Sequence, residues 1–249
     1  MSDAGIDAGI VVPARERVKK HWWRLLVVLV AVAVAAFSWN EAFVGLFGLL
    51  PILVWCGLLA RSARTGVIVG LVLVVLLAWF VVPSEVGWAG PWVPASIEVF
   101  WLHTMLAAVV CGIGALVERR PAVDFSWLGT MVLIGFVVTG GVLFTQLEAV
   151  PGDEGVYPGP SQLRVVPEGY SCGSGNCWRV LEANGDRAPE VMREYLAARG
   201  FTPRPKDTIT GNPEVCRQTG VLVTHEVCAD LRDISASAVR VEWYVNRNM

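Results

Sequence analysis

Apolar residues gather in five blocks within the first 150 positions of the chain, separated by short segments that carry most of the local polar residues. The blocks are Trp22–Trp39, Ala42–Ala60, Gly66–Val82, Ile97–Val117 and Trp127–Leu147. Each has 17 to 21 residues, which is about what a helix needs to cross a hydrocarbon layer ~30 Å thick. A helix also satisfies its own backbone hydrogen bonds, as lipid requires. The pattern therefore predicts a multi-pass domain of five transmembrane helices over residues 22–147.

Lysine and arginine are distributed unevenly among the segments that flank these blocks. Nine of them precede or open the first block or lie in the second-to-third and fourth-to-fifth segments: Arg15, Arg17, Lys19, Lys20, Arg24, Arg61, Arg64, Arg119 and Arg120. The other two segments, Ser38–Glu41 and Pro83–Ser96, have none. Because Lys and Arg are enriched in cytoplasmic loops, residues 1–21 are predicted to form a cytoplasmic basic tail, with the C-terminus on the opposite side.

The first block also has features of a secretion signal. A basic start, an apolar run and the small residues Ala33, Ala35 and Ala36 are typical of a signal peptide. Against cleavage, the second block begins almost at once and the basic start is long. Cleavage would leave four spans with the C-terminal region still outside, so the predicted topology holds in either case.

Composition supports a membrane protein and excludes other classes. The chain is 54% hydrophobic and only 17% charged, whereas a soluble domain has about 25% charged residues. A net charge of -2 gives no basic surface for nucleic acid. The excess of arginine, 17 against 3 lysines, together with many Ala, Val and Gly residues, indicates a high-G+C bacterial genome. We therefore expect a bacterial plasma membrane, with membrane lipids as the first partners.

The last 100 residues have the composition of a folded, water-exposed module. Residues 148–162 are rich in Pro and Gly and predict a linker, and residues 163–249 predict an extracytoplasmic α+β domain. Its expected helix starts at Asp186 or Ala188 and buries Val191, Met192, Tyr195 and Leu196. Its expected strands are Cys177–Glu182, Val221–Val227 and Val239–Val245. The fold expected is a small antiparallel sheet with one helix laid across it.

Four cysteines lie in this module, and two, Cys56 and Cys111, lie inside predicted spans. An even number in a small extracytoplasmic domain predicts disulfides. Of the three possible pairings we favour Cys172–Cys177, which closes a Gly-Ser-Gly-Asn turn, with Cys216–Cys228. Metal binding, with His225 near Cys228, is the alternative, although the spacings are poor zinc signatures.

Ionisable residues are rare inside the predicted spans. Glu98 opens the fourth span and His103 follows five residues later, so on an α-helix they lie about 140° apart and on different faces. Both lie near the outer boundary, where water can reach, and a wet helix end is the expected environment. A direct role in function is the alternative, because buried ionisable groups are costly.

The sequence predicts no catalytic residue, cofactor or metal, and an enzyme is the less favoured class. The leading hypothesis is a non-catalytic protein of the bacterial cell envelope whose external domain binds a partner, as an accessory subunit of a membrane assembly or as a ligand sensor. Arg240, Glu242 and Tyr244 share one strand face and are the candidate contact residues. The alternatives are a transporter or channel component and a membrane-embedded enzyme acting on a lipid-linked substrate. Other envelope proteins, or further copies of the chain, are the expected partners.

Overall fold

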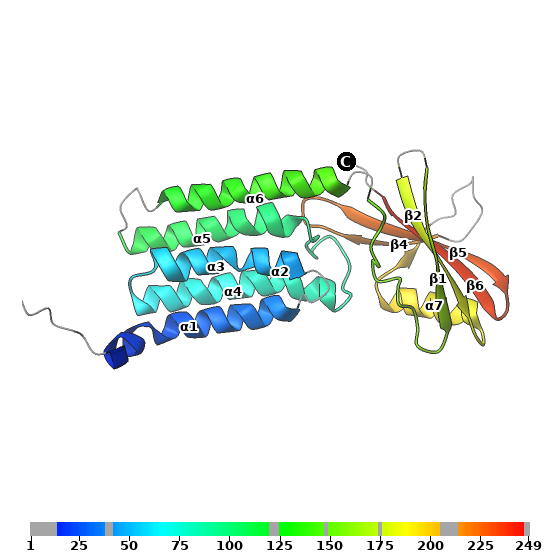
Figure 1. The fold of residues 1–249 in the computed structure, drawn as a ribbon, viewed down its shortest axis with the longest axis horizontal. Coiled ribbons are helices and arrows are strands. Elements are labelled where there is room, and N and C mark those ends of the chain that lie inside the picture. The colour runs from blue at the N-terminus through cyan, green and yellow to red at the C-terminus, as the bar shows by residue number, and fades with distance from the viewer. Residues whose placement is uncertain are drawn as a thin grey trace, which may run out of the picture.

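The computed structural model describes residues 14–37, 42–119, 125–146, 149–173, 176–204 and 214–246. The predicted segment Ser38–Glu41, Arg120 and the first thirteen residues of the predicted basic tail lie outside these ranges. A bundle of helices and a six-stranded sheet lie end to end along the long axis of the molecule (Figure 1). We call them the bundle and the sheet domain.

The helices of the bundle follow the apolar blocks. They are α1 (Ala14–Phe37), α2 (Ala42–Gly48), α3 (Leu50–Val54), the π-helix η2 (Trp55–Leu59), α4 (Ala63–Glu85), the π-helix η3 (Val99–His103), α5 (Thr104–Val117) and α6 (Phe125–Gln146). Within the described ranges, four helical stretches are long and apolar enough to cross a membrane: Ala42–Leu59, Ala63–Glu85, Val99–Val117 and Phe125–Thr145. The first predicted span is a shorter apolar stretch, Trp22–Phe37, within α1.

The second predicted span is interrupted near its only proline. A turn at Leu49 separates α2 from α3, and Pro51 lies in the first turn of α3. Proline has no N–H to donate and fits the first turn of a helix, where that donor is not needed. The span then ends in the π-turn η2.

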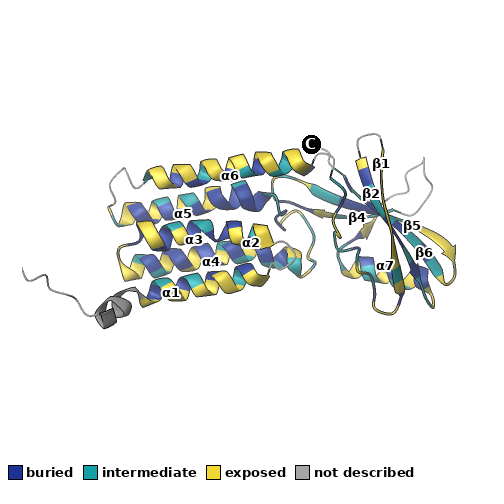
Figure 2. Cartoon of the chain, in the orientation of Figure 1, coloured by how far each residue is buried: buried dark blue, intermediate teal, exposed yellow. Residues whose placement is uncertain are grey.

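Glycines let the helices of the bundle approach closely. A Cβ at Gly66 or Gly70 of α4 would meet the side chain of Trp23 or Val27 of α1. At the bundle centre, the Trp55 indole is fully buried and its Nε1 donates to the carbonyl of Gly66 at 3.1 Å. The outward-facing residues of the bundle, above all those of α6, are exposed (Figure 2). Many of these exposed residues are large and apolar.

The sheet domain is an antiparallel sheet of six strands in the order β1-β2-β6-β5-β4-β3. The strands are β1 (Arg164–Gly173), β2 (Asn176–Asn184), β3 (Thr202–Pro203), β4 (Glu214–Thr219), β5 (His225–Ser235) and β6 (Ala238–Asn246). The predicted strand over Val239–Val245 is β6, and every second residue of it is buried. β1 was not predicted, because its proline and glycines hide the alternation.

One helix, α7 (Ala188–Ala198), covers one face of the sheet (Figure 1). Met192 and Leu196 of the predicted stripe are fully buried, and Val191 and Tyr195 pack at its edge. The helix ends before Gly200, whose φ of +82° suits glycine. Phe201 then folds back into the same core.

The segment expected to be a linker is packed against the sheet. Val156 is fully buried in the core beneath α7. The Trp243 indole donates to the carbonyl of Gly152 at 2.9 Å, and Arg179 forms an ion pair with Asp153. Residues 149–162 are therefore part of the sheet domain and fix it close to the end of α6.

The strand expected over Val221–Val227 begins later than predicted. β5 starts at His225, and residues 220–224 form the turn between β4 and β5. We call this turn the β4–β5 tip. Alternating valines are ambiguous here, because Val221 packs against the bundle rather than in the core of the sheet domain. The contact of this turn with the bundle is the candidate functional site.

Candidate functional site: the joint between bundle and sheet domain

Glu98 lies at the contact between the bundle and the sheet domain and is fully buried. Its Oε1 accepts hydrogen bonds from the backbone N–H groups of Leu222 at 2.6 Å and Val223 at 2.9 Å. Its Oε2 accepts from Val221 and Ala95, both at 2.9 Å. One carboxylate thus satisfies four backbone donors, and three of them come from the β4–β5 tip. Hydrogen bonds to an ionised acceptor are stronger than neutral ones.

The loop between α4 and η3, residues 86–98, pairs with the sheet edge beside this carboxylate. Its Gly90 N–H donates to the carbonyl of Gln218 at 2.8 Å. In return, the Gly220 N–H donates to the carbonyl of Val93 at 2.7 Å. Within the described residues, the short strand β3 pairs with Val215 and Cys216 of β4. The α4–η3 loop covers the next part of the same sheet edge, at Gln218 and Gly220.

Apolar contacts complete the joint. Val221 packs against a cluster made by Phe80, Val99 and Leu102 of the bundle. On the other side, a Cβ at Gly200 would come within 2.6 Å of the Cβ of Ala89. We use "the joint" for Glu98, the α4–η3 loop and the β4–β5 tip. Polar and apolar contacts therefore both join the sheet domain to the bundle at the joint.

The environment of Glu98 and His103 differs from the predicted wet helix end. Both side chains are fully buried, so the expectation that water reaches them is wrong. The expected separation of 140° also assumed α-helical geometry, whereas η3 is a π-turn that winds more residues into each turn. Glu98 is buried because the β4–β5 tip of the sheet domain covers it, whereas His103 packs against Phe80 inside the bundle.

His103 is the second buried ionisable residue of this region. Its ring stands edge-on to Phe80, with the centroids 5.3 Å apart. Among the residues that the structure describes, neither ring nitrogen has a hydrogen-bond partner. Buried polar atoms without partners are uncommon and costly. Among the described residues, the four groups that donate to Glu98 are backbone N–H groups, and His103 is not one of them. Glu98 and His103 therefore do not form a hydrogen-bonded acid–base pair.

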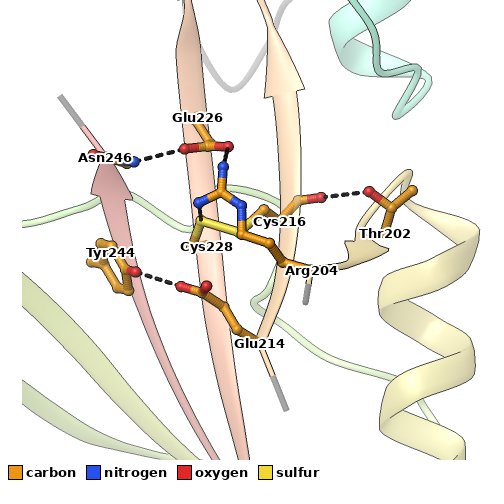
Figure 3. The surroundings of a disulfide bond; sticks show 8 residues. All are labelled: Thr202, Arg204, Glu214, Cys216, Glu226, Cys228, Tyr244 and Asn246. Carbon is orange, nitrogen blue, oxygen red and sulfur yellow. Dashed lines mark hydrogen bonds and ion pairs between the residues drawn. A yellow bond between two sulfur atoms is a disulfide. The ribbon is translucent and has the colours of Figure 1, made fainter. Parts of the chain in front are cut away.

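The sheet face opposite α7 carries a second group of polar residues, around a disulfide (Figure 3). Cys216 and Cys228 are directly opposite each other on β4 and β5 and are bonded. Arg204 lies over the sulfurs and forms an ion pair with Glu226, which also accepts from Asn246 at 2.7 Å. Cys172 and Cys177 form the other bond, at the end of the β1–β2 hairpin. Both predicted pairings are confirmed.

The predicted contact residues lie on this same face. The Tyr244 hydroxyl donates to Glu214, and burial together with that hydrogen bond raises the pKa of Tyr244 above its usual range. The phenol therefore stays protonated and remains a donor. Arg240 forms ion pairs with Glu168 and Glu242 at 3.2 Å. Tyr244, Arg240 and Glu242 each contact a neighbouring side chain. Glu242 of β6 also lies directly opposite Asp230 of β5.

Glu214, Cys216 and Cys228 offer ligand atoms within 4.8 Å of one another, as a metal site would. Because the two sulfurs are bonded to each other, they are not thiolates, and only the carboxylate keeps its ligand character. The arrangement is therefore that of a disulfide with a polar cover. Cys56 and Cys111 are buried inside the bundle as free thiols.

A comparison of the chain with protein-family models, curated proteins and solved structures finds no match. The site must therefore be interpreted from its own geometry.

Several residues of the joint were missed by sequence reasoning. They are Gly90, Val93, Gly220 and the three residues of the β4–β5 tip that donate to Glu98, together with Gln218 of β4, which accepts from Gly90. One signal was present, because Gly220 interrupts the polar run before the alternating valines. A glycine there marks a turn with positive φ, and its φ is +111°. Arg204, Glu214 and Glu226 carried no comparable signal.

Proposed function

We propose that this protein is a multi-pass protein of the bacterial plasma membrane. In this proposal five helices cross the bilayer, the N-terminus is cytoplasmic, and the sheet domain lies in the extracytoplasmic space. There it binds a partner without catalysis, as an accessory subunit of a membrane assembly or as a ligand sensor. The joint transmits the position of the sheet domain to the segment between α4 and α5.

The surface of the bundle supports insertion in lipid. Large apolar side chains point outward along its helices, with Leu29 68%, Val75 69% and Phe144 77% exposed. Exposed apolar surface of this extent is unfavourable in water and matches a hydrocarbon solvent. Trp22–Phe37 of α1 packs along α4 through Trp23 and Val27, which supports counting it as a fifth span. The two disulfides support an oxidising compartment for the sheet domain.

The observation that carries the functional part is Glu98. Its carboxylate is buried in contacts with the sheet domain and so is not free to line a path across the bundle. A charge buried with four donors has a positioning role, which suits a protein that couples an external binding event to its membrane helices. Transport through Glu98 and His103 is not supported by this arrangement.

Topology is tested by adding protease to sealed cells. The proposal expects the sheet domain to be trimmed from outside while the N-terminal tail stays intact. An intact sheet domain in sealed cells, with cleavage only after lysis, would contradict it.

Partner binding is tested by placing a photo-cross-linking residue on the two faces of the sheet domain. Glu242 is on the open face, and Glu190 on the exposed side of α7 is the matched control. The proposal expects one cross-linked species at position 242, found again at the neighbouring position Arg232, and none at position 190. Equal products at all three positions would indicate random contacts and contradict a dedicated binding face.

A further inference from the structure

Leu222, at the β4–β5 tip, is 64% exposed although both of its neighbours in sequence take part in the joint. Its N–H reaches Glu98, and its side chain points away from the contact. A single exposed leucine is ordinary on a protein surface. Leu222 differs because other large apolar side chains are exposed near it.

The α4–η3 loop adds three more large apolar side chains at the same end of the bundle. Val86, Trp88 and Trp92 are each about half exposed, at 47%, 53% and 50%. The two indole rings are paired, with centroids 5.4 Å apart. Residues 86–97 include no Lys, Arg, Asp or Glu. The loop therefore presents an uncharged, aromatic surface beside the tip.

Glu98 fixes the height of the tip relative to the membrane helices. It immediately precedes η3, where the apolar stretch Val99–Val117 begins. Its carboxylate is 2.6 Å from the backbone nitrogen of Leu222. The tip consequently cannot lie farther from the start of this stretch than one glutamate side chain. If Val99–Val117 crosses a bilayer, Leu222 lies at the level where the hydrocarbon ends.

We propose that the β4–β5 tip and the α4–η3 loop are embedded in the outer headgroup layer, with Leu222, Trp88 and Trp92 in contact with phospholipid. The sheet domain then rests on the membrane through its own hairpin. Indole rings favour this layer because they combine an apolar body with a polar N–H. Lipid is the occupant because the loop directly joins the end of α4 to the start of η3, and the outward residues of α4, such as Val75 and Trp79, are exposed and apolar. The inference rests on the proposed membrane location.

Quenching by brominated lipid tests the proposal with the full chain. Bimane is attached to one introduced cysteine in a Cys56→Ala/Cys111→Ala background, in nanodiscs of phosphatidylcholine with plain or brominated acyl chains. Leu222→Cys is the test position. Val75→Cys, near the middle of α4, reports whether the bundle is in lipid. Ile234→Cys, an exposed residue toward the far end of β5, is the matched control on the sheet domain.

The expected result in brominated discs is that bimane at position 75 loses most of its emission and bimane at 234 keeps it. Bimane at 222 loses a smaller but clear part, because it lies at the edge of the hydrocarbon. Full emission at 222 with quenching at 75 overturns the inference and leaves the membrane location intact. Full emission at 75 overturns the membrane location and the inference with it. Trp88→Cys carries the same test if the Leu222→Cys variant does not purify as a folded, monodisperse protein.

Discussion

Glutamates stand at both ends of the helix formed by η3 and α5, and each accepts backbone hydrogen bonds from another part of the chain. Glu118 is partly exposed and accepts from Arg61 at 2.8 Å and from Ser62 at 3.0 Å, in the segment between η2 and α4. Glu98 is fully buried and accepts from a turn more than 120 residues away. The same side chain therefore caps a local loop at one end and attaches a second domain at the other. We expect the contribution of each glutamate to the free energy of unfolding to depend on how deeply it is buried.

The largest effect is expected at Glu98. Glu98→Ala leaves the N–H groups of the tip without an acceptor, and each buried donor without a partner costs ~1–3 kcal/mol. We expect the free energy of unfolding of the sheet domain, measured by denaturant titration in detergent, to fall by about 4 kcal/mol. A loss no greater than that of an exposed glutamate such as Glu190 would show that the joint contributes little.

Gly220→Ala is expected to have the next largest effect. A Cβ there would overlap the carbonyl of Val223, and φ is +111°. Gly169 has nearly the same φ, +113°, with open space around it. Gly169→Ala should therefore cost only the backbone strain of about 1 kcal/mol, and Gly220→Ala about 2–3 kcal/mol. Equal losses of unfolding free energy in the two variants would mean that the tip can shift freely.

Glu118→Ala sharpens the comparison from the other end. The Arg61 and Ser62 N–H groups can turn to water when the carboxylate is removed, so the loss is expected to be about 1 kcal/mol. Thermal unfolding of the bundle measures it, and the sheet domain should keep its stability. A loss as large as that of Glu98→Ala would refute the claim that burial separates the two glutamates.

Ser62→Ala is expected to have the smallest effect. The Ser62 hydroxyl accepts from the Thr65 N–H at 3.1 Å and caps α4 at an exposed position. Its removal should lower the melting temperature of the bundle slightly, corresponding to about 0.5–1 kcal/mol. Ser62→Asp, which keeps an acceptor, should restore the wild-type value, and failure to do so would argue against capping.

The sequence predicted those features that depend on neighbours along the chain. The alternation of β6, the stripe of α7 and the pairing of Cys172 with Cys177 all follow from spacings of a few residues. Cys216 and Cys228 are twelve residues apart and are bonded as predicted. The prediction placed Cys216 in a loop before a strand, whereas it lies in β4, which pairs with β5. Local rules were sufficient for these elements.

The joint could not be predicted in this way. A glutamate at a helix start is usually solvated, and only the folded sheet domain brings the tip to Glu98. The alternating valines after Gly220 fit a strand as well as they fit a turn packed on the bundle. Alternation indicates which side chains are buried, but it does not indicate whether the sheet domain or the bundle buries them. The π-turns likewise leave no pattern in the sequence that distinguishes them from an α-helix.

Hydrogen exchange at the tip tests most directly whether Glu98 attaches the sheet domain to the bundle. In the wild-type chain in nanodiscs, the amides of Val221, Leu222 and Val223 should be protected. In Glu98→Gln, an amide nitrogen replaces one accepting oxygen, and these amides should exchange ~100-fold faster, an increase larger than that of the β6 amides. Tip amides that exchange at the same rate in both proteins would contradict the account.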